Sequence, residues 1–220
     1  MSDATTFRLR INYTKEERLR YLSHLEVVRC MERCIRRAGL PFAVSQGFSP
    51  HMRTAFGWAL GVGIASIDEY LDVLLTDYVP VPKVLASFEG VLPRGMRILG
   101  AQYVAAGDKS LTEELPRSRY ECVFASCDAS FEQAQDALDE LLGIGQIVVV
   151  RKKKEKIVRF EGLLENVPAF ERAPDGSLRF EMATFTEGKG SLRPDLFCAE
   201  LAKLLPELGN AWITRVEQFS

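Results

Sequence analysis

Two neighbouring stretches near the start of the chain decide the fold. Residues 7–13 read FRLRINY, and residues 23–37 read SHLEVVRCMERCIRR. The first alternates apolar and polar side chains with the period of two that predicts a strand. The second places apolar residues on one face of a helix, at Leu25, Val28, Met31 and Ile35. Ser23 followed by Glu26 is the capping-box pattern that begins a helix, so we expect a strand followed by a helix.

The same kinds of pattern continue outward from this pair. Gly39 and Pro41 close the helix. The rest of the first half predicts a short strand at 42–44, a glycine-rich irregular segment at 45–64, a strand at 70–75, a helix at 82–91 and a strand at 96–103. A polar segment, 107–117, predicts a linker. The second half predicts strands at 120–125, 147–150, 178–184 and 212–216, and helices at 131–142 and 192–205.

This order of elements predicts the fold class and the domains. Each half follows the order β-α-β-β-α-β, which is typical of a ferredoxin-like domain. We therefore expect an α+β protein with tandem ferredoxin-like (βαββαβ) domains and antiparallel sheets. The first domain, with the Gly-rich loop, is expected at 1–108 and the second at 118–220.

Composition narrows the classes of function. The 220 residues are 47% hydrophobic and 26% charged, so each half can support its own core. The formal net charge is -2, so any binding of nucleic acid must rest on local patches. The polar N-terminus and the absence of a long apolar run predict a cytoplasmic protein with no membrane association. Five scattered cysteines argue against a disulfide framework.

The sequence lacks the common signatures of cofactor and metal chemistry. It has no GxxxxGK[ST] loop, no GxGxxG after a strand and no GxSxG elbow. With only two histidines, a His-rich metal site is excluded. Cys30 and Cys34 resemble the start of a radical-SAM cluster motif, but the third cysteine is missing. We interpret them as small residues on a helix flank, and we expect no cofactor and no metal.

A basic helix face is the first candidate for a binding surface. Between Phe7 and Ala55 the chain has ten basic and four acidic residues, a local excess of +6. Four arginines of the first helix recur about one turn apart: Arg29, Arg33, Arg36 and Arg37. Guanidinium groups match phosphate geometry, so this stripe could follow an RNA or DNA backbone. The alternative is a solvated face tied down by Glu26 and Glu32.

The irregular loop from Ser45 to Thr54 is the second candidate. It mixes aromatic, basic and polar side chains, with Gln46, Phe48, His51 and Arg53 as candidate nucleic-acid contacts. Phe48 could stack on a base, and His51 and Arg53 could meet phosphate. The alternative is a bulge or hairpin with Phe48 buried in the core.

Two basic segments of the second half are further candidates. One is the run Arg151, Lys152, Lys153 and Lys154, which follows an apolar strand and creates a strong local potential. The other is a Gly-Lys-Gly-Ser loop leading into a helix, where Lys189 and Arg193 could bind an anion. The alternatives are a solubilising tip and a flexible loop.

The two histidines are candidates for catalysis. His24 lies next to a helix N-cap, where the helix dipole tends to keep imidazole neutral and suited to a general base. His51 lies in the irregular loop. A lone histidine is more often structural, and neither has a visible partner in the sequence.

Several blocks resemble the radical-SAM-linked family, a domain of unknown function. They are LSHLE at 22–26, RRAGLP at 36–41, SQGFSPH at 45–51, EYLDV at 69–73, RKKK at 151–154, GSLRP at 190–194 and ITR at 213–215. The resemblance covers nearly the whole chain, although AFGWA at 55–59 stands where the family has a more proline-rich run. Family members occur fused or adjacent to a radical-SAM protein, often near genes for an RNase of the E/G type and for ribosomal proteins. The resemblance therefore implies an accessory role in RNA metabolism.

Three functions follow as hypotheses. The first is a noncatalytic partner of a radical-SAM enzyme that binds or presents RNA. The second is a metal-independent RNA endonuclease using His24 or His51, by analogy with the paired ferredoxin-like RNA-processing proteins of CRISPR systems. The third is a module that only binds another protein.

Overall fold

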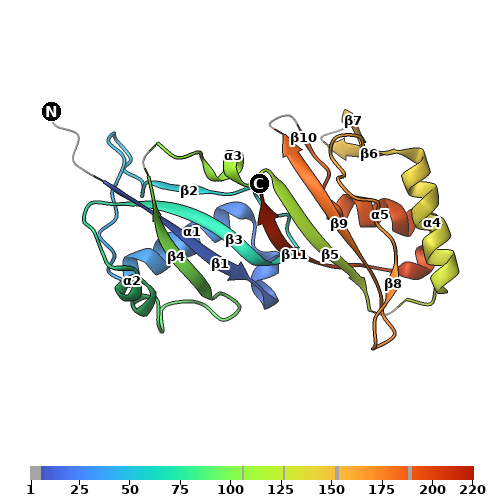
Figure 1. Ribbon diagram of the computed structural model, residues 1–220, viewed down its shortest axis with the longest axis horizontal. Coiled ribbons are helices and arrows are strands. Elements are labelled where there is room, and N and C mark those ends of the chain that lie inside the picture. The colour runs from blue at the N-terminus through green and yellow to red at the C-terminus, as the bar shows by residue number, and fades with distance from the viewer. Residues whose placement is uncertain (1–5, 106, 126, 152–153, 188–189) are drawn as a thin grey trace. The chain divides into compact units, whose positions relative to one another are not determined.

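The chain is a mixed α+β protein with mostly antiparallel sheets (Figure 1). The computed structural model describes residues 6–105, 107–125, 127–151, 154–187 and 190–220. The chain divides into two compact units, residues 1–115 and 116–220, and each is described by itself. The α+β class and the antiparallel pairing agree with the prediction.

The sheet of the first unit has its longest strands in the middle. Its strands are β1 (Phe7–Lys15), β2 (Thr54–Phe56), β3 (Ala65–Leu75) and β4 (Ile98–Val104). They lie in the order β4-β1-β3-β2, and every neighbouring pair is antiparallel. The register places Ile11 of β1 opposite Leu71 of β3 and Ala101 of β4. The strand predicted at 7–13 is therefore central in this sheet.

Helices of the first unit pack against its sheet and complete the core. They are the 3-10 helix η1 (Glu17–Tyr21), α1 (His24–Arg37), α2 (Val81–Ser87) and α3 (Leu111–Glu114). The core cluster combines inward residues of β1 and β3 with those of α1 and α2, among them Leu9, Ile11, Val73, Met31, Ile35 and Val84. The capping box predicted for α1 is present, because the Ser23 backbone N–H donates to Glu26 Oε2 at 2.8 Å.

Charged side chains of β1 and β3 form a buried network with α3. Arg10 Nε donates to Asp72 Oδ1 at 2.8 Å, and Arg10 Nη1 pairs with Glu114 Oε2 of α3 at 2.6 Å. Arg8 also bonds Asp72, at 2.6 Å. Burial alone would lower the pKa of Arg10, but the hydrogen bonds to Asp72 and Glu114 outweigh it and raise the pKa. This network ties residues 107–115, which belong to the segment 107–117 expected to be a linker, to the first sheet.

The second unit has a main sheet and a separate hairpin. The strands of the main sheet are β5 (Arg117–Phe124), β8 (Glu171–Arg172), β9 (Leu178–Glu187), β10 (Gly190–Ser191) and β11 (Trp212–Phe219). They run in the order β10-β9-β5-β11, with the short β8 beside β9. The hairpin pairs β6 (Gln146–Arg151) with β7 (Lys154–Arg159). The helices are α4 (Phe131–Ile144), α5 (Pro194–Leu204) and the 3-10 helix η2 (Pro206–Leu208).

The strand predicted at 147–150 exists, but it does not join the main sheet of the second unit. The place beside β9 is taken by residues 163–165, where Glu165 N–H donates to Ala183 O and Phe185 N–H donates to Leu163 O, both at 2.9 Å. Residues 147–150 instead form β6 in the hairpin. An apolar run of this length identifies a strand but does not identify its partner.

Three local differences in the first unit have simple causes. A strand, β2, forms at 54–56 inside the segment expected to be irregular. The helix predicted at 82–91 ends at Ser87, because the chain turns through Gly90, whose φ is +73°. The short α3 forms within the segment expected to be a linker, where Glu114 reaches Arg10.

Candidate nucleic-acid interface

The four arginines of α1 project into solvent. Arg29, Arg33, Arg36 and Arg37 are all exposed. In the part of the chain that the structure describes, none of them forms a salt bridge, and Glu26 is instead bound to Ser23 in the capping box. The opposite holds for a set of arginines elsewhere, each of which pairs with a carboxylate: Arg8, Arg10, Arg94, Arg97, Arg117, Arg119, Arg179 and Arg193. The predicted tying of this face by Glu26 and Glu32 gives no salt bridge among the described residues. The pKa of Glu26 is lowered mainly by its hydrogen bonds with Ser23, and the charge of Arg29 also contributes.

Most other basic residues of the first fifty positions form hydrogen bonds or ion pairs within the first unit. Lys15, almost fully buried, donates to the carbonyl oxygens of Arg20 at 3.1 Å and Ile64 at 3.3 Å. Arg20 Nε donates to Gly63 O at 2.7 Å. Arg8 and Arg10 belong to the network with Asp72. An approaching ligand would therefore meet most of this local positive charge on α1.

A groove runs along the second half of α1. It is lined by Cys30, Arg33, Cys34 and Arg37 on one side and by residues 90–93 on the other. Its volume is about 560 Å³, within the roughly 300–1,000 Å³ that small ligands occupy in proteins. Two exposed guanidinium groups at its edge make it suited to an anionic group.

The two cysteines in this groove have unequal acidity. The thiol of Cys34 lies 3.6 Å from Val91 O and also hydrogen-bonds Cys30. This hydrogen bond, helped by the charges of Arg33 and Arg37, lowers the pKa of Cys30. The same hydrogen bond, together with burial, raises the pKa of Cys34. The groove therefore favours a single thiolate, at Cys30, over two.

The loop from Val44 to Met52 is a protruding hairpin. Its base is closed by the Val44–Met52 bridge and by the Ser45 N–H, which donates to His51 O at 2.7 Å. The His51 N–H donates back to Ser45 Oγ at 3.0 Å. Phe48, at the tip, is fully exposed, so the alternative in which it fills the core is wrong.

The predicted contacts of this hairpin are all accessible. Gln46, His51 and Arg53 are exposed like Phe48, while Met52 between them is buried and anchors the hairpin. Arg53 is fixed through its backbone, since its N–H donates to Ala43 O at 2.9 Å and its carbonyl accepts from Leu74 N–H at 3.0 Å. The side chains are therefore presented on a backbone joined to β3.

The basic segments of the second unit are placed less favourably for binding an anion than the arginines of α1. Arg151 and Lys154 pair across the tip of the β6–β7 hairpin, where Lys154 is exposed. Lys152, Lys153 and Lys189 lie outside the described residues.

Arg193 is the N-cap residue of α5, and its guanidinium forks onto the carboxylate of Asp195. That hydrogen bond raises the pKa of Arg193 despite its partial burial. Its charge is already matched by Asp195, so Arg193 is a weaker anion ligand than the arginines of α1.

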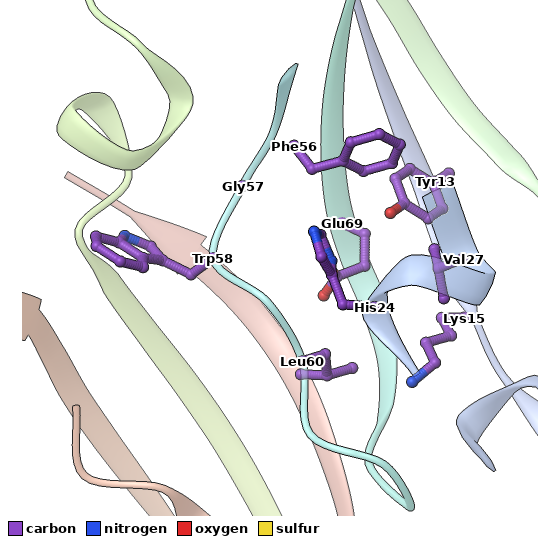
Figure 2. A pocket seen from close by; sticks show the side chains of 9 residues that line it. All are labelled: Tyr13, Lys15, His24, Val27, Phe56, Gly57, Trp58, Leu60 and Glu69. Atoms are coloured by element: carbon purple, nitrogen blue, oxygen red, sulfur yellow. The ribbon is translucent and has the colours of Figure 1, made fainter. Parts of the chain in front are cut away.

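His24 lines a small enclosed cavity beneath the segment that follows β2 (Figure 2). The other lining residues are Tyr13, Lys15, Val27, Phe56, Gly57, Trp58, Leu60 and Glu69. The imidazole meets the Phe56 ring edge-on, with 5.8 Å between the ring centres. The cavity holds about 10 Å³, which is roughly the space of one water molecule. A substrate does not fit beside His24 in this conformation.

Neither histidine has the orienting partner that a general base requires. The ring nitrogens of His24 and His51 form no hydrogen bond to another residue in the described part of the chain. His51 lies on the exposed hairpin, whereas His24 faces the closed cavity with Phe56. The structure therefore offers two isolated imidazoles rather than a catalytic pair.

Sequence reasoning missed the groove. Cys30 and Cys34 are buried in the core cluster, in agreement with their interpretation as packing residues, but nothing in the sequence places residues 90–93 opposite them. The i, i+4 spacing of Arg33 with Arg37 and of Cys30 with Cys34 was the available signal. No cluster of three or more metal-ligating side chains occurs among the described residues. No helix there is long and apolar enough to cross a membrane.

Comparison with known proteins gives the family. The family model described as "Uncharacterized protein conserved in bacteria (DUF2344)" matches residues 8–194, so the chain belongs to this family of unknown function. No curated protein matches the sequence.

Two solved structures are similar at low identity. One is a chain of a Cbf5-Nop10-Gar1 complex, with 11% identity and a TM-score of 0.48, covering 96% of this chain and 48% of that one. The other is an unknown protein from Galdieria sulphuraria, with 14% identity and a TM-score of 0.28, covering 98% of this chain and 100% of that one. This chain thus spans about half the length of the first.

Proposed function

We propose that this chain binds single-stranded RNA through its first unit, as the noncatalytic partner of a radical-SAM enzyme. The observation that carries the proposal is the contrast among the arginines. The four on α1 form no salt bridge among the described residues, whereas eight arginines elsewhere do, among them Arg8, Arg10 and Arg179 on the sheets. Guanidinium groups without a carboxylate partner can neutralise phosphates and release counterions.

The hairpin supplies the second half of the interface. A fully exposed phenylalanine on a fixed backbone is a stacking platform for a base. Bases inside a duplex are already stacked on each other, so Phe48 would engage a base only in a single strand or a loop. Gln46, His51 and Arg53 stand next to it and would contact the ribose and phosphate groups.

The groove along α1 would hold one phosphate of the bound strand. Arg33 and Arg37 stand at its edge, and its 560 Å³ leaves room for more of a nucleotide than the phosphate alone. Exclusion of water from part of this groove would strengthen the charge-assisted hydrogen bonds made there.

The radical-SAM partner rests on the resemblance of the motifs at 22–51 and 151–194, and the second unit is its proposed docking region. The finer fold assignment is also proposed. We infer that both units are ferredoxin-like, supported by the order β4-β1-β3-β2 in the first and by β11-β5-β9 with residues 163–165 in the second.

Binding of the purified chain to a short unstructured RNA and to a duplex of the same sequence tests the proposal. Fluorescence anisotropy would be recorded at low and at moderate salt. We expect the single strand to bind more tightly than the duplex, with an affinity that falls steeply as salt rises. Equal affinity for the duplex would contradict the role of Phe48. No binding of either RNA at low salt would contradict the proposal as a whole.

A further inference from the structure

The groove along α1 contains two thiols, and one of them is open to it. Cys30 and Cys34 lie about one helical turn apart on α1, and both line the groove. Cys30 keeps 9% of its surface exposed, whereas Cys34 keeps only 2%. A molecule in the groove would therefore reach Cys30 before Cys34. A cysteine reacts as a nucleophile in its thiolate form, so the state of the Cys30 sulfur decides what this access means.

The neighbours of Cys30 favour its thiolate. Cys34 and Arg33 both hydrogen-bond Cys30, and the charge of Arg37 also acts on it. The hydrogen bond with Cys34 has the largest effect, and together these interactions lower the pKa of Cys30 although burial opposes them. The same hydrogen bond, with burial, raises the pKa of Cys34. One turn of α1 thus places a thiolate beside a thiol that stays protonated.

The lining of the groove favours an anionic organic molecule. Among the described residues, none that lines the groove is acidic, and the exposed Glu89 beside residues 90–93 is not part of the lining. Arg33 and Arg37 are exposed at the groove, and guanidinium groups bind carboxylates through paired hydrogen bonds. The volume of about 560 Å³ is that of a site for an organic molecule, and an oxidant as small as a peroxide would need neither this room nor two arginines.

We propose that Cys30 is a thiol-modification site, at which an anionic low-molecular-weight disulfide forms a mixed disulfide with the protein. Arg33 and Arg37 bind the carboxylates of the incoming disulfide and hold one of its sulfur atoms at Cys30. Cys34 is a positioning residue, because it acts through its hydrogen bond to Cys30 and does not touch the incoming molecule.

The reaction is a thiol–disulfide exchange. The thiolate of Cys30 attacks one sulfur of the small disulfide, a bond forms between these two sulfur atoms, and the sulfur–sulfur bond of the small molecule breaks. The other half leaves as a thiolate and takes a proton from water. Cys30 is oxidised and the released half is reduced, so no further oxidant is needed. Cys34 remains a thiol, so it does not displace the bound half, and the mixed disulfide persists.

The inference goes beyond the proposed function and does not rest on it. The groove is also the place proposed for an RNA phosphate, so a group attached to Cys30 would exclude that phosphate. The experiment below contains no RNA, and its outcome is therefore separate from that of the RNA-binding measurements.

The full reduced chain would be incubated with oxidised glutathione or with its ester, in which the carboxylates are blocked. These two disulfides react through the same sulfur atoms but differ in charge. Mass spectrometry of peptides would give the rate of adduct formation at each cysteine. We expect Cys30 to react about tenfold faster with the free acid than with the ester, because each exposed charge pair contributes a factor of up to about five. The partly exposed Cys127 should show no such preference.

Two arginine variants separate recognition from acidity. In Arg33→Ala with Arg37→Ala, the preference of Cys30 for the free acid should disappear. A less acidic Cys30 would slow both reagents alike, so the ratio of the two rates reports recognition alone. Arg119→Ala with Arg179→Ala removes the same charge from the second unit and should keep the wild-type ratio. All four arginines lie at the surface of the protein, and melting temperatures near that of the wild type would show that the variants fold.

Three results would overturn the inference. The first is the absence of an adduct on Cys30 with oxidised glutathione. The second is a rate ratio at Cys30 that equals the ratio at Cys127 or survives the loss of Arg33 and Arg37. The third is a disulfide between Cys30 and Cys34 in place of the adduct, which would show that Cys34 displaces the bound half.

Discussion

The guanidinium carbon of Arg36 lies 5.5 Å from the centre of the Phe42 ring. This cation–π contact joins the end of α1 to the segment that leads into the Phe48 hairpin. It holds two parts of the proposed interface, one basic and one aromatic, in a fixed relation within the first unit. Contacts of this kind contribute about 0.5–1 kcal/mol at exposed positions.

The coupling between Arg36 and Phe42 is open to a double-mutant cycle. Arg36→Ala and Phe42→Leu would be made singly and together, and the free energy of unfolding measured in urea. We expect a coupling energy of about 0.5–1 kcal/mol, because each single change removes the same contact. Strict additivity would mean that the contact contributes nothing in solution.

Replacement of Phe48 should weaken RNA binding without weakening the fold. The side chain is fully exposed, so Phe48→Ala removes no core packing. Loss of one stacked base costs roughly 1–3 kcal/mol, which corresponds to an affinity about 5- to 150-fold lower for a short unstructured RNA. Trp212→Ala, at an exposed aromatic residue of the second unit, is the control and should bind RNA as the wild type does. Equal losses of RNA affinity in the two variants would argue against a role of the hairpin in RNA binding.

The acidity of Cys30 gives a direct probe of the groove. Alkylation needs the thiolate, and the pKa of Cys30 is lowered by its hydrogen bond with Cys34. The rate of its reaction with iodoacetamide, followed by mass spectrometry, should therefore rise at a lower pH than that of an ordinary thiol. Cys34, whose pKa is raised, should stay unreactive at that pH.

Two further alkylation measurements connect Cys30 to its neighbours. Replacing Arg33 and Arg37 with alanine should move the midpoint to higher pH, because their charges favour the thiolate. Bound RNA should slow the reaction of Cys30 if a phosphate occupies the groove. The rate of the partly exposed Cys127 would serve as the internal control. Unchanged alkylation of Cys30 in the presence of saturating RNA would remove the groove from the interface.

The network around Asp72 should dominate the stability of the first sheet. Asp72 is buried and accepts hydrogen bonds from Arg8 and Arg10. Asp72→Ala would leave the buried Arg10 with only Glu114, and breaking such a pair costs about 3–5 kcal/mol. Glu114→Gln should cost about 1 kcal/mol or less, because Glu114 is 40% exposed and its pair is screened by solvent. Equal losses of unfolding free energy in the two variants would contradict this ranking.

The sequence predicts most of the elements because their signals are local. The alternation in 7–13 and the Ser23–Glu26 capping box depend only on neighbouring residues, and both give the elements observed. The partner of β6 was missed because an apolar run such as 147–150 fits any partner. The helix α3 has a local signal, the capping box of Ser110 and Glu113, but it is only four residues long, and its contact between Glu114 and Arg10 cannot be read from the sequence.

The site shows the same division between local and distant information. The arginine stripe of α1 follows from helical spacing alone. Its lack of partners does not, because that depends on where the carboxylates of other elements lie. The exposure of Phe48 was left open by the sequence, since a hairpin and a buried bulge use the same glycine and proline signals. The groove needs residues 90–93 to meet α1 across the fold.

The salt dependence of RNA binding tests the central claim most directly. Arg33→Ala with Arg37→Ala would be compared with Arg119→Ala with Arg179→Ala, a pair that removes the same charge from arginines bound to Glu217 and Glu121. Each phosphate contact contributes about 0.7 to the slope of log K against log salt for a single strand. The account predicts that the α1 variant flattens this slope by about 1.4 units, while the control keeps the wild-type slope. Equal slopes in both variants and the wild type would contradict the account.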